Sequence, residues 1–125
     1  DDCKIATLAK RIDNKEEIEN PNVVKVVKDV KDYALYFSRS KIPFNRESNK
    51  SIKYFKHIGL YAFRSETLKA ITRLPVSALE IAESLEQLRW MENGYKIKVA
   101  ETELESMAID TNADLKMAEA LYFSR

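Results

Sequence analysis

The valine-rich segment 23–30 constrains the fold of this chain more than any other feature of its sequence. Five of its eight residues are valine, and β-branched side chains favour extended strands because they pack well on a pleated surface. Lys31 and Asp32 then fit a short turn, and residues 33–39 fit a second strand. The segment therefore predicts a β-hairpin.

Strand-like and helix-like segments alternate through the rest of the chain. Further strands are expected over residues 4–8, 57–64, 95–101 and 106–110, and helices over 66–72, 77–93 and from 111 onward. Ser77 and Glu80 form a capping box that opens the long helix, and Gly94 supplies the residue that ends it. This alternation predicts an α/β fold with a mixed sheet.

Composition narrows the class of protein. A length of 125 residues fits one domain or part of one, and no apolar run approaches the ~18 residues of a membrane span. The single cysteine and the absence of a signal-peptide pattern fit a reducing, cytoplasmic setting. Nucleic-acid binding is not expected, because the net charge is only +1. The basic stretch 39–56 either binds anions or is a solvated loop.

Three separated stretches hold polar residues in a fixed order that is hard to match by chance. They are residues 20–27 running on to 36–43, which end in Ser38-Arg39-Ser40-Lys41-Ile42-Pro43; residues 56–61, Lys56-His57-Ile58-Gly59-Leu60-Tyr61; and residues 85–89, Leu85-Glu86-Gln87-Leu88-Arg89, followed by Ile109-Asp110-Thr111. In this order they resemble the second half of the CMP-Kdo synthetases, the 3-deoxy-manno-octulosonate (Kdo) cytidylyltransferases of lipopolysaccharide biosynthesis. The likeness runs from about Ile5 to Leu115.

The resemblance implies a nucleotide-diphospho-sugar-transferase-like, Rossmann-like fold, of which residues 1–125 are the second half only. By the same resemblance, we expect that half to bind the sugar acid and to form the dimer, with the N-terminal nucleotide-binding half absent. Only two glycines occur, so no glycine-rich phosphate loop can be built from this chain. We therefore expect the chain alone to be incomplete as an enzyme.

Asp110 is the candidate metal ligand. It ends an expected strand just before a helix, where its carboxylate either holds Mg²⁺ or caps the helix. The resemblance favours the metal, because the matching segment of the family contains an Asp that helps hold it. Here Ala108 stands where Gly is common, and Asn112-Ala113 where Pro-Glu is common.

Five residues are candidates for binding the sugar acid. His57 and Tyr61 fall on one face of their expected strand, about 13 Å apart with Gly59 between them; from the sequence alone, a hydrogen-bonded His and a core Tyr in half-covered positions are the favoured interpretation. The resemblance assigns them to sugar hydroxyls. It also assigns Glu86 and Gln87, expected in mid-helix, to hydroxyls, and the guanidinium of Arg39 to the sugar carboxylate, where the alternative is a surface ion pair. The full set is Arg39, His57, Tyr61, Glu86 and Gln87.

The implied reaction is that of CTP with Kdo to give CMP-Kdo and pyrophosphate, with Mg²⁺ as cofactor and a homodimer as the assembly. Two alternatives stay open at this point. One is a cytidylyltransferase for another keto-acid sugar, such as a sialic or amino-Kdo acid. The other is a noncatalytic dimerisation module.

Overall fold

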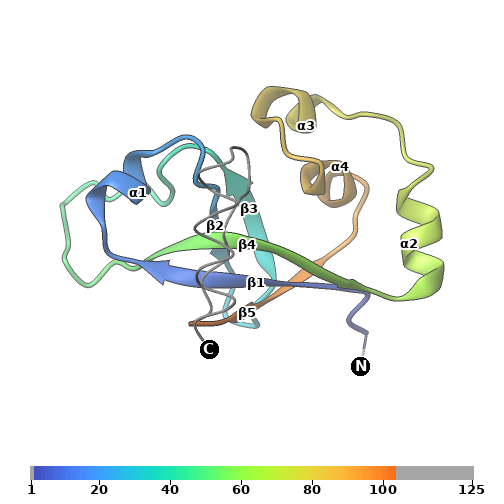
Figure 1. Ribbon diagram of the computed structural model, residues 1–125, viewed down its shortest axis with the longest axis horizontal. Coiled ribbons are helices and arrows are strands. Elements are labelled where there is room, and N and C mark those ends of the chain that lie inside the picture. Colours follow the sequence, from blue (N-terminus) through green and yellow to red (C-terminus); the bar gives the residue numbers. More distant parts are fainter. Residues whose placement is uncertain (1, 104–125) are drawn as a thin grey trace, which may run out of the picture.

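A computed structural model of the protein describes residues 2–103, which form a mixed five-stranded sheet with four short helices (Figure 1). The strand order is β3-β2-β4-β1-β5. The elements are β1 (Ile5–Ile12), α1 (Lys15–Glu19), β2 (Lys25–Lys28), β3 (Ala34–Ser38), β4 (Tyr54–Phe63), α2 (Ser65–Ile71), α3 (Ala78–Glu83), α4 (Gln87–Glu92) and β5 (Ile97–Glu101). Asp110, the strand expected at 106–110 and the helix expected from 111 lie outside the described residues. Within the described part, no helix is both long and apolar enough to cross a bilayer.

The long strand β1 organises the sheet. It pairs antiparallel with β4 and parallel with β5, which confirms the expected mixed sheet. β1 continues to Ile12 rather than ending at Leu8, because its pairing with β4 continues as far as Ile12 and Tyr54. Alternate residues Ile5, Thr7 and Ala9 are buried along its first part.

The expected hairpin is present as β2 and β3, with a longer turn than two residues. The carboxylate of Asp29 accepts hydrogen bonds from the backbone N–H groups of Lys31 at 2.8 Å and Tyr33 at 2.9 Å. Asp32 adopts a left-handed φ of 69°, a conformation that Asp tolerates better than most residues. The Asp29 side chain thus fixes the turn in place of the favoured Asn-Gly pair.

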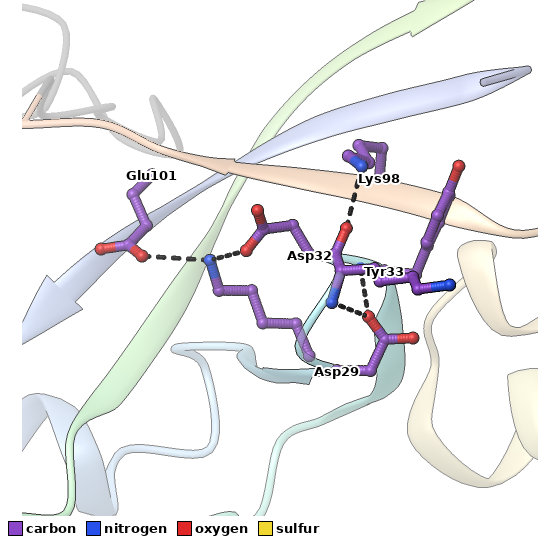
Figure 2. A network of polar contacts seen from close by, with 7 residues as sticks. Asp29, Asp32, Tyr33, Lys98 and Glu101 are labelled. Carbon is purple, nitrogen blue, oxygen red and sulfur yellow. Dashed lines mark hydrogen bonds and ion pairs between the residues drawn. The ribbon is translucent and has the colours of Figure 1, made fainter. Parts of the chain in front are cut away.

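The tip of the hairpin reaches the far edge of the sheet (Figure 2). The Val99 N–H of β5 donates to the carbonyl of Asp32 at 2.8 Å, and Lys98 Nζ donates to the carbonyl of Lys31 at 2.8 Å. Lys28 Nζ lies 2.8 Å from Asp32 Oδ1 and 3.0 Å from Glu101 Oε2. Because β3 and β5 are opposite ends of the strand order, the hairpin must cross the sheet to make these contacts, as Figure 1 shows. We call this group of contacts the hairpin clasp.

The single helix expected over 77–93 is wrong, because the chain breaks into α3 and α4 at Ser84, where φ is 54°. A straight helix would place Ile81 on the same face as Leu85 and Leu88. Instead Ile81 is 69% exposed, whereas Leu85 and Leu88 are buried. Of the expected capping box, the hydrogen bond from the Ser77 N–H to Glu80 Oε1 is present at 3.2 Å.

Arg39 explains the break. Its guanidinium donates to the carbonyls of Glu83 at 2.7 Å and Ser84 at 3.2 Å. A continuous helix would need both carbonyls for its own i to i+4 hydrogen bonds. A residue 44 positions away therefore ends α3, and α4 is then free to turn Leu88 and Trp90 into the core.

Candidate functional site

A groove lies between the segment that precedes β2 and the middle of β4. Its volume is about 430 Å³. Asn22, Val23 and Val24 form one side, and Lys56, His57, Ile58 and Gly59 form the other. A Cβ built on Gly59 would meet no atom within 4 Å, which confirms the open space expected there. Two of the three sequence stretches singled out above therefore meet in this groove.

An irregularity in β4 shapes the site. Leu8 of β1 pairs with Ile58 of β4, and the preceding residue, Thr7, pairs with Tyr61. Gly59 and Leu60 thus have no partner on β1 and form a bulge, which bends the strand. The expected spacing of 13 Å is wrong for these side chains because it assumed a regular strand: the ring centroids of His57 and Tyr61 lie 5.3 Å apart.

His57 is a neutral hydrogen-bonding group at pH 7. Its ring lies edge-on to Phe37 of β3, with centroids 4.9 Å apart, and its Nε2 lies 2.8 Å from the hydroxyl oxygen of Thr7. Burial lowers the pKa of His57 from 6.5 to about 4, because desolvation disfavours the charged imidazolium. The side chain therefore contributes hydrogen bonds to the groove, not charge.

Tyr61 lies between His57 of the same strand and Trp90 of α4. Its ring is 5.3 Å from His57 and 5.1 Å from Trp90 of α4. Its hydroxyl is buried and has no hydrogen-bond partner among residues 2–103. Burial raises the pKa of Tyr61, and the negative charge of Glu86 adds to the shift. A buried hydroxyl without a partner is costly, so this position suits a ligand that supplies one.

Glu86 and Gln87 stand at the start of α4 and not in mid-helix as expected, because the chain breaks at Ser84. Glu86 is exposed, whereas Gln87 is only 7% exposed. No hydrogen bond joins the Gln87 amide to any residue in the described part of the chain. Gln87 thus has spare hydrogen-bonding capacity, but unlike the Tyr61 hydroxyl its amide is not fully shielded from water.

Arg39 is more firmly bound within the chain than the sequence suggests. Besides the carbonyls of Glu83 and Ser84, it donates to the carbonyl of Pro21 at 3.1 Å. A guanidinium has five N–H groups, so, among the contacts within residues 2–103, one remains unused on each terminal nitrogen. Arg39 therefore links the end of β3 to the segment before β2 and to the turn after α3. Its binding of a carboxylate stays a prediction.

The family of the chain follows from comparison with known proteins. The family described as "Cytidylyltransferase" matches residues 1–97. The chain belongs to that family.

Individual cytidylyltransferases match over almost the whole chain. The protein named 3-deoxy-manno-octulosonate cytidylyltransferase from Bacteroides thetaiotaomicron is 55% identical, and the match covers 98% of this chain and 52% of that protein. The protein of the same name from Thermodesulfovibrio yellowstonii is 54% identical, and the match covers 92% of this chain and 47% of that protein. A solved structure of CMP:2-keto-3-deoxy-manno-octonic acid synthetase complexed with CTP is 41% identical with a TM-score of 0.90, over 98% of this chain and 50% of that one. The chain thus spans about half the length of the relatives it matches, and its α/β fold is that of a nucleotide-sugar transferase.

Lys25 is a residue of this cytidylyltransferase chain that sequence reasoning missed. It is fully buried, and its Nζ donates to the carbonyls of Asn20 at 2.8 Å, Val23 at 2.5 Å and Arg39 at 2.9 Å. Burial lowers the pKa of Lys25. The available signal was a lysine inside a valine-rich strand, a position where a long cation must find partners.

The candidate metal site cannot be built from the described residues. Asp110 lies outside them, and residues 2–103 contain no group of three His, Cys, Asp or Glu side chains placed to hold an ion. The carboxylate of Asp110 is an oxygen donor of the kind that Mg²⁺ prefers, so the assignment remains a prediction.

Proposed function

We propose that this chain is the sugar-acid-binding half of a CMP-Kdo synthetase, which transfers CMP from CTP to Kdo and releases pyrophosphate. The names of the relatives that are about half identical to the chain support this reaction. The solved relative with the same fold is complexed with CTP.

One observation supports the assignment to a sugar. The Tyr61 hydroxyl is fully buried and has no partner among residues 2–103. Nδ1 of His57 and the amide of Gln87 also lack a partner there, although neither is fully shielded from water. Such groups favour a ligand with several hydroxyls, because each new hydrogen bond satisfies a polar group that is otherwise costly to bury. The ring of Phe37 packs against His57, and the ring of Trp90 packs against Tyr61.

The charge states of His57 and Arg39 suit them to different groups of the ligand. His57 is neutral at pH 7, so it suits a hydroxyl, whereas the two remaining N–H groups of Arg39 suit the carboxylate of a keto acid. Mg²⁺, when bound, would neutralise the triphosphate of CTP, and Asp110 would hold it. The residues that bind the phosphates of CTP would belong to the half of the relatives that this chain does not span.

Binding and turnover test the proposal separately. Ligand-observed NMR on this chain should detect binding of Kdo but not of CTP, and incubation with CTP, Kdo and Mg²⁺ should release no pyrophosphate. Tighter binding of a sialic acid than of Kdo would shift the assignment to another keto-acid sugar. Binding of none of these sugars would favour a noncatalytic module.

We also propose that the chain forms a homodimer through the β2–β3 hairpin. Leu35, on β3, is 61% exposed and Val30, in the turn, is fully exposed, and apolar residues at the outer edge of a sheet favour association. Sedimentation should show a dimer that Leu35→Glu weakens. An equal change with Leu68→Glu, at an exposed apolar residue of α2, would argue against this surface.

A further inference from the structure

We propose that Thr7 is a positioning residue that holds His57 in the tautomer protonated at Nε2, so that Nδ1 is left as an acceptor for a hydroxyl of the ligand. The identity of the ligand rests on the proposed function. The state of the imidazole does not, because it follows from contacts within the chain.

The Thr7 hydroxyl meets three groups at once. Its oxygen lies 2.7 Å from the carbonyl oxygen of Leu60, 3.2 Å from that of Ile58 and 2.8 Å from Nε2 of His57. Thr7 is only 3% exposed, so water does not compete effectively for these contacts.

Counting protons decides which way each hydrogen bond runs. A threonine hydroxyl has one proton to donate and two lone pairs that accept. The two carbonyl oxygens can only accept, so they take the hydroxyl proton, with Leu60 the nearer. The contact with His57 must then be donated by the ring, from Nε2–H to the Thr7 oxygen. The opposite tautomer would leave the hydroxyl oxygen and the Leu60 oxygen 2.7 Å apart without a proton between them.

The bulge in β4 makes this arrangement possible. Gly59 and Leu60 are the two unpaired residues, and Thr7 stands at the position on β1 where the pairing resumes. A regular strand would pair its carbonyls with the backbone of β1. Here the carbonyl of Leu60 meets the Thr7 side chain instead, and that contact commits the hydroxyl proton. The bulge therefore sets both the closeness of His57 to Tyr61 and the tautomer of His57.

As a consequence, the groove should prefer a ligand that donates a hydrogen bond to Nδ1 of His57. Nδ1 of His57 has no hydrogen-bond partner among residues 2–103, and His57 lines the groove. A neutral ring with Nε2–H committed to Thr7 can only accept at Nδ1. A hydroxyl can donate to it, whereas a carboxylate, which has no proton at neutral pH, cannot. His57 thus discriminates in favour of a hydroxyl at its place in the groove.

The chain offers an unambiguous readout, because it contains one histidine. Long-range ¹H–¹⁵N correlation spectra of the labelled chain at pH 7 distinguish protonated from unprotonated ring nitrogens. We expect a single tautomer with the proton on Nε2 in the native chain and in Thr7→Ser, and a mixture in Thr7→Val. The proposal is wrong if the native ring carries its proton on Nδ1, or if Thr7→Val leaves the spectrum unchanged.

A second measurement connects the tautomer to the ligand. Kdo should move the Nδ1 resonance, and Thr7→Val should weaken Kdo binding by roughly 5- to 10-fold, the effect of about one misplaced hydrogen bond, with recovery in Thr7→Ser. Thr72→Val is the matched control, because it removes a threonine hydroxyl bonded to the exposed carbonyl of Lys69; binding should be unchanged.

The two measurements separate the two claims. An Nε2–H ring that binds no sugar would contradict the proposed function and leave the role of Thr7 standing. Kdo binding to a native ring protonated at Nδ1 would do the reverse. Backbone amide spectra of each variant confirm that the fold is retained.

Discussion

The buried ammonium of Lys25 lies 2.9 Å from the carbonyl oxygen of Arg39. The side chain of one cationic residue thus binds the backbone of the other. Lys25 fixes the end of β3, and Arg39 reaches from there to the turn that separates α3 from α4. The loop before β2, the end of β3 and the start of α4 are thereby set relative to one another.

Replacing Lys25 by Met should destabilise the chain by about 3 kcal/mol, because it removes three part-buried hydrogen bonds to backbone carbonyls. Urea unfolding followed by circular dichroism measures the change. Lys69→Met, at an exposed lysine of α2, serves as the control and should alter stability by less than about 0.5 kcal/mol. A loss as small as that of the control would show that the three hydrogen bonds contribute little.

Replacing Arg39 by Lys should loosen the turn at Ser84, because a lysine cannot donate to the carbonyls of Pro21, Glu83 and Ser84 from fixed directions. We expect a loss of about 1–2 kcal/mol and increased amide exchange at residues 84–88. Unchanged exchange there would contradict the explanation given for the helix break.

The stability of the chain should fall as the pH drops from about 6.5 to 4 because of His57. Its pKa is lowered from 6.5 to about 4 in the folded chain, so the unfolded state binds the proton first and gains from it. The contribution is complete above pH 6.5 and is lost as the pH falls toward 4, on the order of 3 kcal/mol. Comparing urea unfolding at pH 7 and 5 in the native chain and in His57→Gln isolates this part. Equal pH dependence in both would rule it out.

The two glycines should respond differently to alanine. Gly94 has a φ of +87°, so Gly94→Ala should cost about 1 kcal/mol. Gly59→Ala should leave stability within about 0.5 kcal/mol, because its new methyl group meets no atom. The same methyl group would lie beside the groove and should weaken sugar binding. A stable Gly59→Ala chain that binds Kdo normally would move the ligand away from this groove.

The hairpin clasp should show a measurable coupling between Lys28 and Glu101, whose charged atoms lie 3.0 Å apart. A double-mutant cycle with Lys28→Met and Glu101→Gln should give about 0.5 kcal/mol, as is usual for pairs with one exposed partner. The coupling should shrink in 1 M salt. Additive effects of the two substitutions would mean that the ion pair does not hold the hairpin tip.

Local signals predicted the parts of the fold that local interactions determine. The valine run predicted the hairpin, and Gly94 was rightly placed at the end of its helix. The break at Ser84 was not predictable from the same kind of signal, because the Arg39 guanidinium that hydrogen-bonds the end of α3 lies 44 positions away. The residues of the expected apolar stripe are therefore divided between α3, α4 and the turn that joins them.

The geometry of the candidate site was less predictable than the fold, and the roles of its residues stay predictions. The rings of His57 and Tyr61 lie 5.3 Å apart, but nothing in the sequence marks the bulge at Gly59 and Leu60, which brings them closer than a regular strand would. Thr7 and Lys25 were missed because their roles depend on what lies across the sheet. Asp110 remains a prediction.

The turn at the tip of the hairpin has one more effect. A bare strand rim is a template on which other chains can add strands and aggregate. The carbonyl of Asp32 accepts a hydrogen bond from the N–H of Val99 on the outer side of β5, so the turn blocks the addition of another strand at that point. A substitution that opens the clasp should therefore first appear as a loss of solubility during refolding.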